Sequence, residues 1–257
     1  CSVLNRNDVV NVQFESKMMD DLEVAIQQNP HALAEPAISI YLGIYQLLKS
    51  KNPEEQLFQN TLQLLHKHGE DFEDGELRFA YHFMKKHCIN MINEGRQEFY
   101  QLFLDLSKQM FDSEIIFENG ELRNGVYKNL VTVACKLEHY EWADWFAKEY
   151  CGHLKKELRK DALLYARGYI SFEKGDYESA WRILHGHSFS DIFYNLDSRA
   201  MCLKISYELH DVGLSGIEEP EQIIASNKAY SHRKRKALAP GQMERQLNFW
   251  KFAGQLH

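Results

Sequence analysis

The sequence predicts an all-α fold, a right-handed α-solenoid of about five helical hairpins that follow one N-terminal helix. Three observations support this prediction. Apolar residues recur at three- and four-residue spacing along the 257-residue chain, helix breakers interrupt them at regular intervals, and no segment alternates as a strand does. We therefore expect residues 1–257 to form a single continuous helical-repeat domain.

The expected helices follow one another in chain order. The first covers residues 9–28, and later apolar stripes fall within residues 77–91, 99–110, 126–137, 158–172 and 196–207. Equivalent turns are expected at Lys51, Gly95, Glu138, Gly175 and His210, which are 44, 43, 37 and 35 residues apart. Helix-pair repeats have periods of about 34 to 47 residues, so each interval matches one hairpin.

The segment 165–180 shows one hairpin most clearly. Gly168 removes a side chain where two helices approach closely, Gly175 ends the first helix, and Ala180 keeps the second helix close to the first. Residues 137–143 share Tyr, Glu and Ala with residues 174–180 at the same offsets. This pattern resembles a tetratricopeptide (TPR) hairpin, so the predicted solenoid is one of TPR-like hairpins.

A second resemblance covers the chain from about residue 77 to its C-terminus. It depends on segments 118–120, 127–133, 175–177 and 193–197, and on the terminal Leu-Asn-Phe-Trp-Lys-Phe of residues 247–252. Together these are similar to a family of uncharacterised bacterial TPR-like proteins. The resemblance implies a bacterial helical-repeat protein and no activity, because that family has no assigned catalytic residues or ligand.

Composition bounds the class of protein. The formal net charge of -7 argues against a protein whose main task is to bind nucleic acid. No apolar run approaches the roughly 18 to 20 residues of a membrane span. The five cysteines are odd in number and widely spaced, which favours five free thiols and a cytoplasmic location.

The chain begins with Cys1 rather than methionine. We expect an upstream segment to have been removed or left out. The alternative is that Cys1 is the lipidated residue of a bacterial lipoprotein.

No motif for catalysis, nucleotide binding or a cofactor is present, so we expect no enzyme and no cofactor. The loop Gly213-Leu214-Ser215-Gly216 comes closest to a nucleophile elbow and has the wrong spacing. Two His-x-His pairs, His66/His68 and His185/His187, point in different directions on a helix. A zinc site at His185 and His187, completed by Cys151 and His153, is an alternative to solvent-facing or capping histidines.

Two features of the sequence are candidate partner sites. The basic run Arg233, Lys234, Arg235 and Lys236, with His232 before it, is most simply a solvated helix face or connector. A nucleic-acid adaptor that uses residues 232–236, or a protein-facing basic patch, is the alternative. The aromatic cluster Trp142, Trp145, Phe146 and Tyr150 is expected to be core, with a partner-binding patch as the alternative.

The TPR resemblance implies a partner-binding groove on the concave face. Carried over residue by residue, its first-helix positions fall on Lys128, Lys136, Tyr165, Tyr169, Lys204 and Tyr207. We therefore expect a non-catalytic scaffold that binds a protein or peptide partner there. Tyr165 and Tyr169 also belong to the apolar stripe of their helix, so core packing is the alternative for them. An enzyme with an unrecognised site is the remaining alternative function.

Overall fold

The computed structural model describes residues 17–50, 55–210, 217–238 and 240–255. Thirteen α-helices and no named strand occur in these residues, which confirms the all-α prediction. None of the helices within the described ranges is long and apolar enough to cross a membrane. The chain divides into two compact units, the first ending at Leu137 and the second beginning at Glu138. The right-handed solenoid and the single continuous domain stay predictions.

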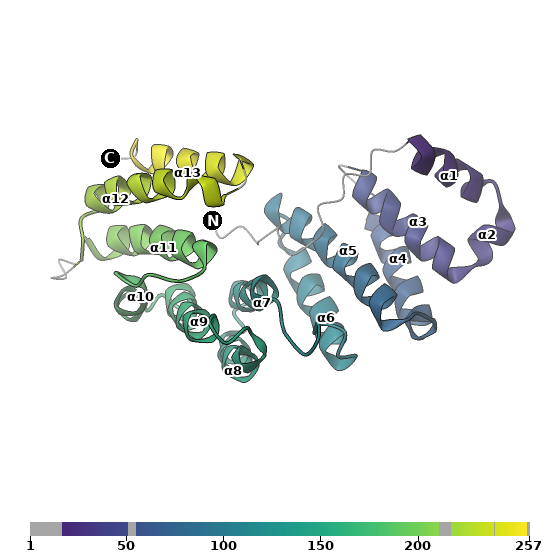
Figure 1. Ribbon diagram of the computed structural model, residues 1–257, viewed down its shortest axis with the longest axis horizontal. Helices are drawn as coiled ribbons and strands as arrows, with labels where there is room; N and C mark the ends of the chain where they lie inside the picture. Colours follow the sequence, from purple (N-terminus) through teal and green to yellow (C-terminus); the bar gives the residue numbers. More distant parts are fainter. Residues whose placement is uncertain (1–16, 51–54, 211–216, 239, 256–257) are drawn as a thin grey trace. The chain divides into compact units, whose positions relative to one another are not determined.

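The first unit is built from consecutive helices that pack on their neighbours (Figure 1). They are α1 (Lys17–Gln27), α2 (Pro30–Ala34), α3 (Pro36–Lys49), α4 (Glu55–His68), α5 (Asp74–Asn93), α6 (Phe99–Asp112) and α7 (Asn124–Lys136). α3 packs against α4 and α5, and α6 packs against α5 and α7. Of the helix expected over residues 9–28, the described part is α1. The turn expected at Lys51 lies outside the described residues.

Local signals in the sequence explain where these helices begin and end. Asn29 precedes α2 and accepts the backbone N–H groups of His31 and Ala32 at 3.1 and 3.3 Å, and Pro36 opens α3 at a position where its missing N–H costs nothing. Gly95 follows α5 with a φ of 96°, as expected for a turn that ends a helix.

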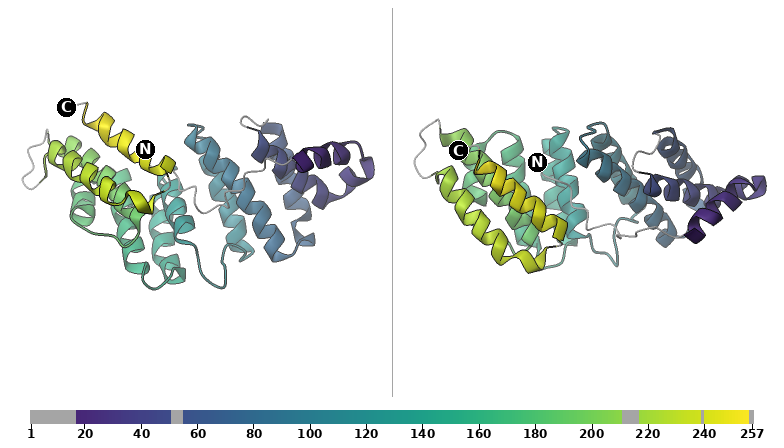
Figure 2. Two further views of the ribbon diagram at one scale, coloured as in Figure 1. Left: turned by 45° about the horizontal axis from the view of Figure 1, so that its top comes forward. Right: turned by 90° about the horizontal axis from the view of Figure 1, so that it is seen from above.

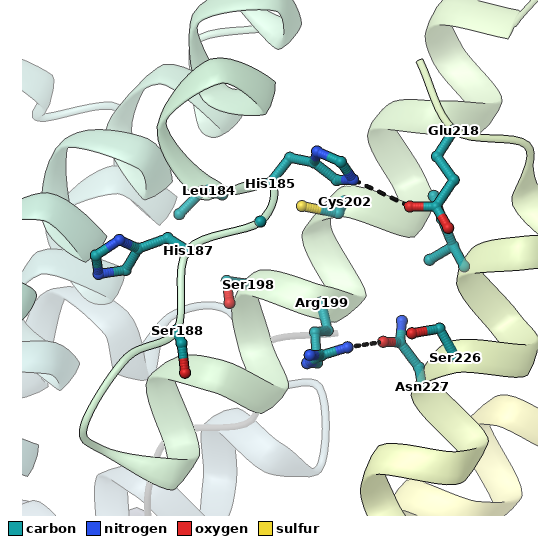
Figure 3. Close-up of a pocket in the computed structure, with 12 residues that line it drawn as sticks. Leu184, His185, His187, Ser188, Ser198, Arg199, Cys202, Glu218, Ser226 and Asn227 are labelled. Carbon is teal, nitrogen blue, oxygen red and sulfur yellow. Dashed lines mark hydrogen bonds and ion pairs between the residues drawn. The ribbon is translucent and has the colours of Figure 1, made fainter. Parts of the chain in front are cut away.

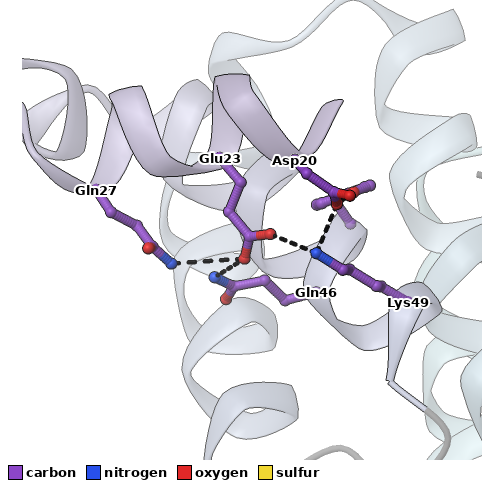
Figure 4. Close-up of polar contacts among 6 residues, drawn as sticks. Asp20, Glu23, Gln27, Gln46 and Lys49 are labelled. Atoms are coloured by element: carbon purple, nitrogen blue, oxygen red, sulfur yellow. Dashed lines mark hydrogen bonds and ion pairs between the residues drawn. The ribbon is translucent and has the colours of Figure 1, made fainter. Parts of the chain in front are cut away.

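A polar network joins α1 to α3 (Figure 4). Lys49 Nζ lies 2.6 Å from Asp20 Oδ1 and 3.0 Å from Glu23 Oε2, and Gln46 Nε2 donates to Glu23 Oε1 at 2.9 Å. The hydrogen bond from Lys49 lowers the pKa of the Asp20 carboxyl. Since these groups are accessible to water, the network fixes the position of α1 on α3 more than it stabilises the fold.

The second unit continues the pattern of neighbouring helices. It contains α8 (Tyr140–Tyr150), α9 (Arg159–Glu173), α10 (Tyr177–Leu184), α11 (Ile192–His210), α12 (Pro220–Arg233) and α13 (Pro240–Ala253). α9 packs against α8, α10 and α11, and α11 packs against α12. α12 and α13 lie side by side in both views of Figure 2. The expected helix end at His210 is the last residue of α11.

The α9–α10 hairpin confirms the close approach expected at Gly168. A Cβ atom at Gly168 would lie 2.5 Å from Leu184 Cδ2 and 2.6 Å from Leu184 Cγ, well inside van der Waals contact. Ala180 of α10 is fully buried. The absence of a side chain at Gly168 therefore permits these two helices to pack as closely as they do.

The internal match between residues 137–143 and 174–180 is also visible in the backbone. Gly175 has a φ of 79° and Glu138, at the matching position, has a φ of 60°. The matching tyrosines, Tyr140 and Tyr177, each begin a helix. The two sequences therefore form the same type of turn, although only one of them has the glycine that this conformation favours.

Candidate functional site

A cavity of about 200 Å³ lies in the second unit, between α11, the beginning of α12 and the loop that follows α10 (Figure 3). Its polar lining comes from three segments that are distant in the sequence. The side chains that decide its chemistry are His185, Ser198, Arg199, Cys202, Glu218 and Asn227.

Arg199 is the principal charged group of this pocket. Its Nη1 atom donates to Oδ1 of Asn227 at 2.6 Å, and its guanidinium carbon lies 4.2 Å from the centroid of the Tyr230 ring. Within the described residues Nε and Nη2 donate no hydrogen bond, and both remain accessible to solvent. Burial lowers the pKa of the Arg199 guanidinium. The pocket thus holds a partly buried cation that forms no ion pair within the described residues, with Glu218 as the nearby carboxylate.

His185 and Glu218 form a second polar pair in the lining. His185 Nε2 lies 3.0 Å from Glu218 Oε2, and the His185 ring stacks on Trp181 with centroids 4.0 Å apart. Figure 3 shows this pair spanning from the loop after α10 to the segment that precedes α12. The pair therefore links two segments of the pocket wall.

The loop after α10 is held at its far end by Asn195 of α11. The amide oxygen of Asn195 accepts the backbone N–H of Phe189 at 3.1 Å. Its Nδ2 atom donates to the carbonyl oxygen of Phe189 and, at 2.9 Å, to that of Asp191. Asn195 is buried, so these bonds are shielded from water.

Asp161 of α9 holds the middle of the same loop. It accepts the backbone N–H and the hydroxyl of Ser190 at 2.6 and 2.7 Å, and lies 3.2 Å from Nε2 of His187. Burial opposes ionisation of Asp161, but these donors outweigh it and lower the pKa of the carboxyl. The loop is thus attached to both α9 and α11.

Two nucleophile-type side chains of the pocket, Cys202 and Ser198, are not activated. Burial raises the pKa of the Cys202 thiol to about 12, so it is protonated at neutral pH. The Ser198 hydroxyl donates to the backbone oxygen of Asn195 at 3.1 Å. These groups favour binding rather than covalent chemistry.

The aromatic cluster of α8 divides into a buried and an exposed part. Phe146 is fully buried, as expected, and stacks on Trp142 and Tyr150 at 5.1 Å. Trp145 is 50% exposed, and its ring centroid lies 6.1 Å from that of Trp142 and 5.8 Å from that of Tyr150. The expectation that the whole cluster is core therefore fails at Trp145. We call Trp142, Trp145 and Tyr150 the α8 aromatic surface.

Two of the predicted groove residues are core residues. Tyr165 and Tyr169 are 0% and 1% exposed. Tyr165 stacks on Tyr194 at 4.4 Å, and its hydroxyl donates to Asp197 Oδ2 at 3.3 Å. The cause is that α9 is covered by both α10 and α11. The prediction that these tyrosines line an accessible groove does not hold.

The other four predicted groove residues differ in environment. Lys128 is buried and Lys136 is exposed, both on α7 of the first unit. Lys204 and Tyr207 are partly buried on α11 of the second unit, with Lys204 Nζ 5.8 Å from the centroid of the Phe172 ring. Burial of Lys128 removes it from any accessible surface. A partner role for Lys136, Lys204 and Tyr207 stays a prediction.

The remaining predicted site residues have ordinary surroundings. Arg233, Lys234, Arg235 and Lys236 are all exposed at the end of α12 and in the turn after it. The described part of the chain contains no group of three or more His, Cys, Asp or Glu side chains that is arranged to hold a metal ion. His185 and His187 instead pair with different carboxylates.

The sites that involve the loop Gly213–Gly216 and Cys1 lie outside the described residues. The other four cysteines, Cys88, Cys135, Cys151 and Cys202, are free thiols.

Arg199 and Asn227 are not among the residues predicted from the sequence, although the sequence contains a signal for Arg199. Arg199 follows Leu196 by three residues and precedes Leu203 by four, so it lies on the apolar face of α11. A charged residue on such a face is expected to have a special environment. Its approach to Asn227 depends on the packing of α11 against α12 and has no local pattern.

Comparison of this chain with protein-family models, with curated proteins and with solved structures found no match.

Proposed function

We propose that the protein is a non-catalytic scaffold that binds a protein or peptide partner, and that the α8 aromatic surface forms the centre of the contact. The single observation that supports this most strongly is the exposure of Trp145, at 50%, on a helix whose other side is packed. Tryptophan and tyrosine are enriched among the residues that dominate binding energy at protein interfaces. The TPR-like architecture predicted from the sequence agrees with such a role.

The surroundings of Trp145 support a contact with a polar rim. Asp144 and Lys148, its neighbours on α8, form an ion pair at 2.5 Å, and Glu149 is exposed. An aromatic centre bordered by charged groups is the usual composition of a protein interface. The free thiols of Cys88 and Cys135 also agree with the reducing cytoplasm that we propose as the location.

The test begins with selection of peptides from a displayed library on the full-length protein. Affinities of the selected peptides are then measured by calorimetry for the wild type, for Trp145→Ala and for Phe252→Ala. Phe252, on α13, is the matched control because it is 62% exposed and also aromatic. We expect Trp145→Ala to weaken binding by more than about tenfold, the loss typical of a residue at an interface centre.

Phe252→Ala is expected to leave the affinity unchanged, and far-ultraviolet circular dichroism should show that both variants are folded. Peptides that bind Trp145→Ala as tightly as the wild type would refute the role of the α8 aromatic surface. Failure to select any specific peptide would refute the peptide-binding function.

A second candidate function, a nucleic-acid adaptor, is favoured by the exposure of all four basic residues from Arg233 to Lys236. Contact with phosphates would make the affinity depend steeply on salt. We expect no sub-micromolar binding of labelled RNA or DNA oligonucleotides at physiological salt. Tight, salt-dependent binding that is lost when these residues are changed to Gln would instead establish the adaptor function.

A further inference from the structure

The half-buried Arg199 has no ion pair at contact distance within the described residues, although the carboxylate of Glu218 in the same pocket acts on it at longer range. Its only hydrogen bond within the described residues is to the neutral amide of Asn227, and it forms no ion pair there. Charged groups that leave water are normally paired, because desolvation costs more than one neutral hydrogen bond returns. Arg199 therefore has the environment expected of a residue whose counter-ion is supplied from outside the chain.

The guanidinium is held in a defined orientation. Nη1 is held by Asn227 Oδ1, and the Tyr230 ring lies beneath the guanidinium plane. The atoms left over, Nε and Nη2, form the edge of an arginine that donates two parallel hydrogen bonds. That edge matches the two oxygens of a carboxylate.

Asn227 provides a second sign that the pocket is incomplete. Because arginine has only donors, Asn227 must direct its oxygen toward Arg199, which leaves its Nδ2 as a donor. Asn227 is 2% exposed, and its Nδ2 has no hydrogen-bond partner among the described residues. Figure 3 shows this nitrogen on the side toward Glu218, within the pocket lining. Asn227 therefore keeps an unsatisfied donor beside the pocket.

Size and charge restrict the class of ligand. The cavity of about 200 Å³ is smaller than the roughly 300 to 1,000 Å³ of sites for drug-sized molecules. Glu218 also lines the pocket, and its carboxylate would repel a doubly charged phosphate more than a singly charged carboxylate.

We propose that this pocket binds a carboxylate group, which is held by Nε and Nη2 of Arg199 while Asn227 fixes the orientation of the guanidinium. The carboxylate belongs either to a small organic acid or to an acidic side chain or C-terminus of a bound peptide. The site is separate from the α8 aromatic surface and does not depend on it.

The experiment uses N-acetylglutamate as the probe and its neutral isostere N-acetylglutamine as the matched ligand. The full-length protein is titrated with each, and binding is followed by calorimetry and by the Nε–H resonance of Arg199 in ¹⁵N spectra. We expect N-acetylglutamate to shift this resonance and to bind at least about tenfold more tightly than N-acetylglutamine, since only N-acetylglutamate has a side-chain carboxylate that accepts two hydrogen bonds from arginine.

Three variants test the geometry. Arg199→Lys keeps the positive charge but loses the pair of parallel N–H donors. Asn227→Asp supplies an internal carboxylate that competes with the ligand for Arg199. Both should weaken binding at least about tenfold, whereas Arg182→Gln, at an exposed arginine of α10 outside the pocket, should not. Thermal unfolding shows whether each variant is folded. If the Arg199→Lys protein is folded and binds N-acetylglutamate as tightly as the wild type does, the proposal is overturned.

Titration with other ligands identifies the source of the carboxylate and tests the ligand class. An acidic peptide that binds at least tenfold more tightly than N-acetylglutamate would support a peptide carboxylate, and equal affinity would support a small acid. Inorganic phosphate that binds more tightly than N-acetylglutamate would overturn the ligand class. Trp145→Ala should leave acid binding unchanged, so failure of the scaffold proposal and failure of this one are distinguishable.

Discussion

Replacement of Gly168 by alanine tests the packing of the α9–α10 hairpin. The new Cβ atom would lie 2.5 and 2.6 Å from Leu184 Cδ2 and Cγ, and 3.2 Å from Ile183 Cγ2. Carbon atoms in contact are normally about 3.5 to 4.0 Å apart, so an overlap of about 1 Å must be relieved. Leu184 is 2% exposed and has little space into which it can move. The substitution therefore overpacks the hairpin.

The expected magnitude is the difference between two effects. Overpacking of a core costs about 1 to 3 kcal/mol. Alanine in a helix interior is favoured over glycine by about 1 kcal/mol. We therefore expect Gly168→Ala to lower the free energy of unfolding by up to about 2 kcal/mol, the residual of these two effects. Gly241→Ala in α13 is the matched control, because a Cβ there meets nothing within 4 Å.

Urea unfolding followed by tryptophan fluorescence measures this change in the second unit, which contains all four tryptophans. The double variant Gly168→Ala/Leu184→Ala isolates the contact, because removal of the leucine creates room for the new methyl group. The cost of Gly168→Ala should then fall by about 1 to 3 kcal/mol, as expected for residues in direct contact. If Gly168→Ala raises the unfolding midpoint as Gly241→Ala does, the close approach is refuted.

Three further predictions concern other parts of the fold. Burial lowers the pKa of His87 from 6.5 to about 4, so the unfolded chain binds a proton more readily between these values. His87 should therefore contribute a loss of stability of up to about 3 kcal/mol from pH 6.5 to 4. In urea unfolding followed by circular dichroism, His87→Leu should reduce the pH dependence without abolishing it, because burial also lowers the pKa of His82 to about 4. Cys202, with a thiol pKa of about 12, should react with iodoacetamide at pH 8 far more slowly than the partly exposed Cys151. Mass spectrometry of the native protein after timed alkylation measures both rates, and equal rates would contradict this prediction. Gly175→Ala should lower the free energy of unfolding by about 1 kcal/mol, because residue 175 has a φ of 79°. Glu138→Gly should not lower it, since Glu138 also has a positive φ. If the Gly175→Ala protein is as stable as the wild type, the assigned turn is wrong.

The sequence predicts local structure well because its signals are local. Gly168, Gly175 and Ala180 lie within one hairpin, and their spacing alone indicates a turn between two close helices. The positive φ at Glu138 could also be expected, although no glycine marks it, because the surrounding residues match the turn at Gly175.

The sites were less predictable because they depend on which helix covers which face. Tyr165 lies both on an apolar stripe and at a TPR groove position, and only the packing of α11 on α9 decides between them. Trp145 is on the same helix as the buried Phe146, and periodicity does not show which aromatic faces a neighbour. The pairing of Arg199 with Asn227 joins residues 28 positions apart, which no local pattern indicates.

The anchoring of the loop after α10 affects how the pocket would meet a ligand. Asn195 and Asp161 fix the backbone at Phe189 and Ser190 from two different helices, so the loop has its shape before anything binds. Ordering a mobile loop would cost about 1 to 2 kcal/mol for each residue fixed, and here that cost is met during folding. The proposed small carboxylate ligand would therefore bind without first rearranging the pocket wall, and its association should be limited by diffusion into the pocket rather than by a conformational step.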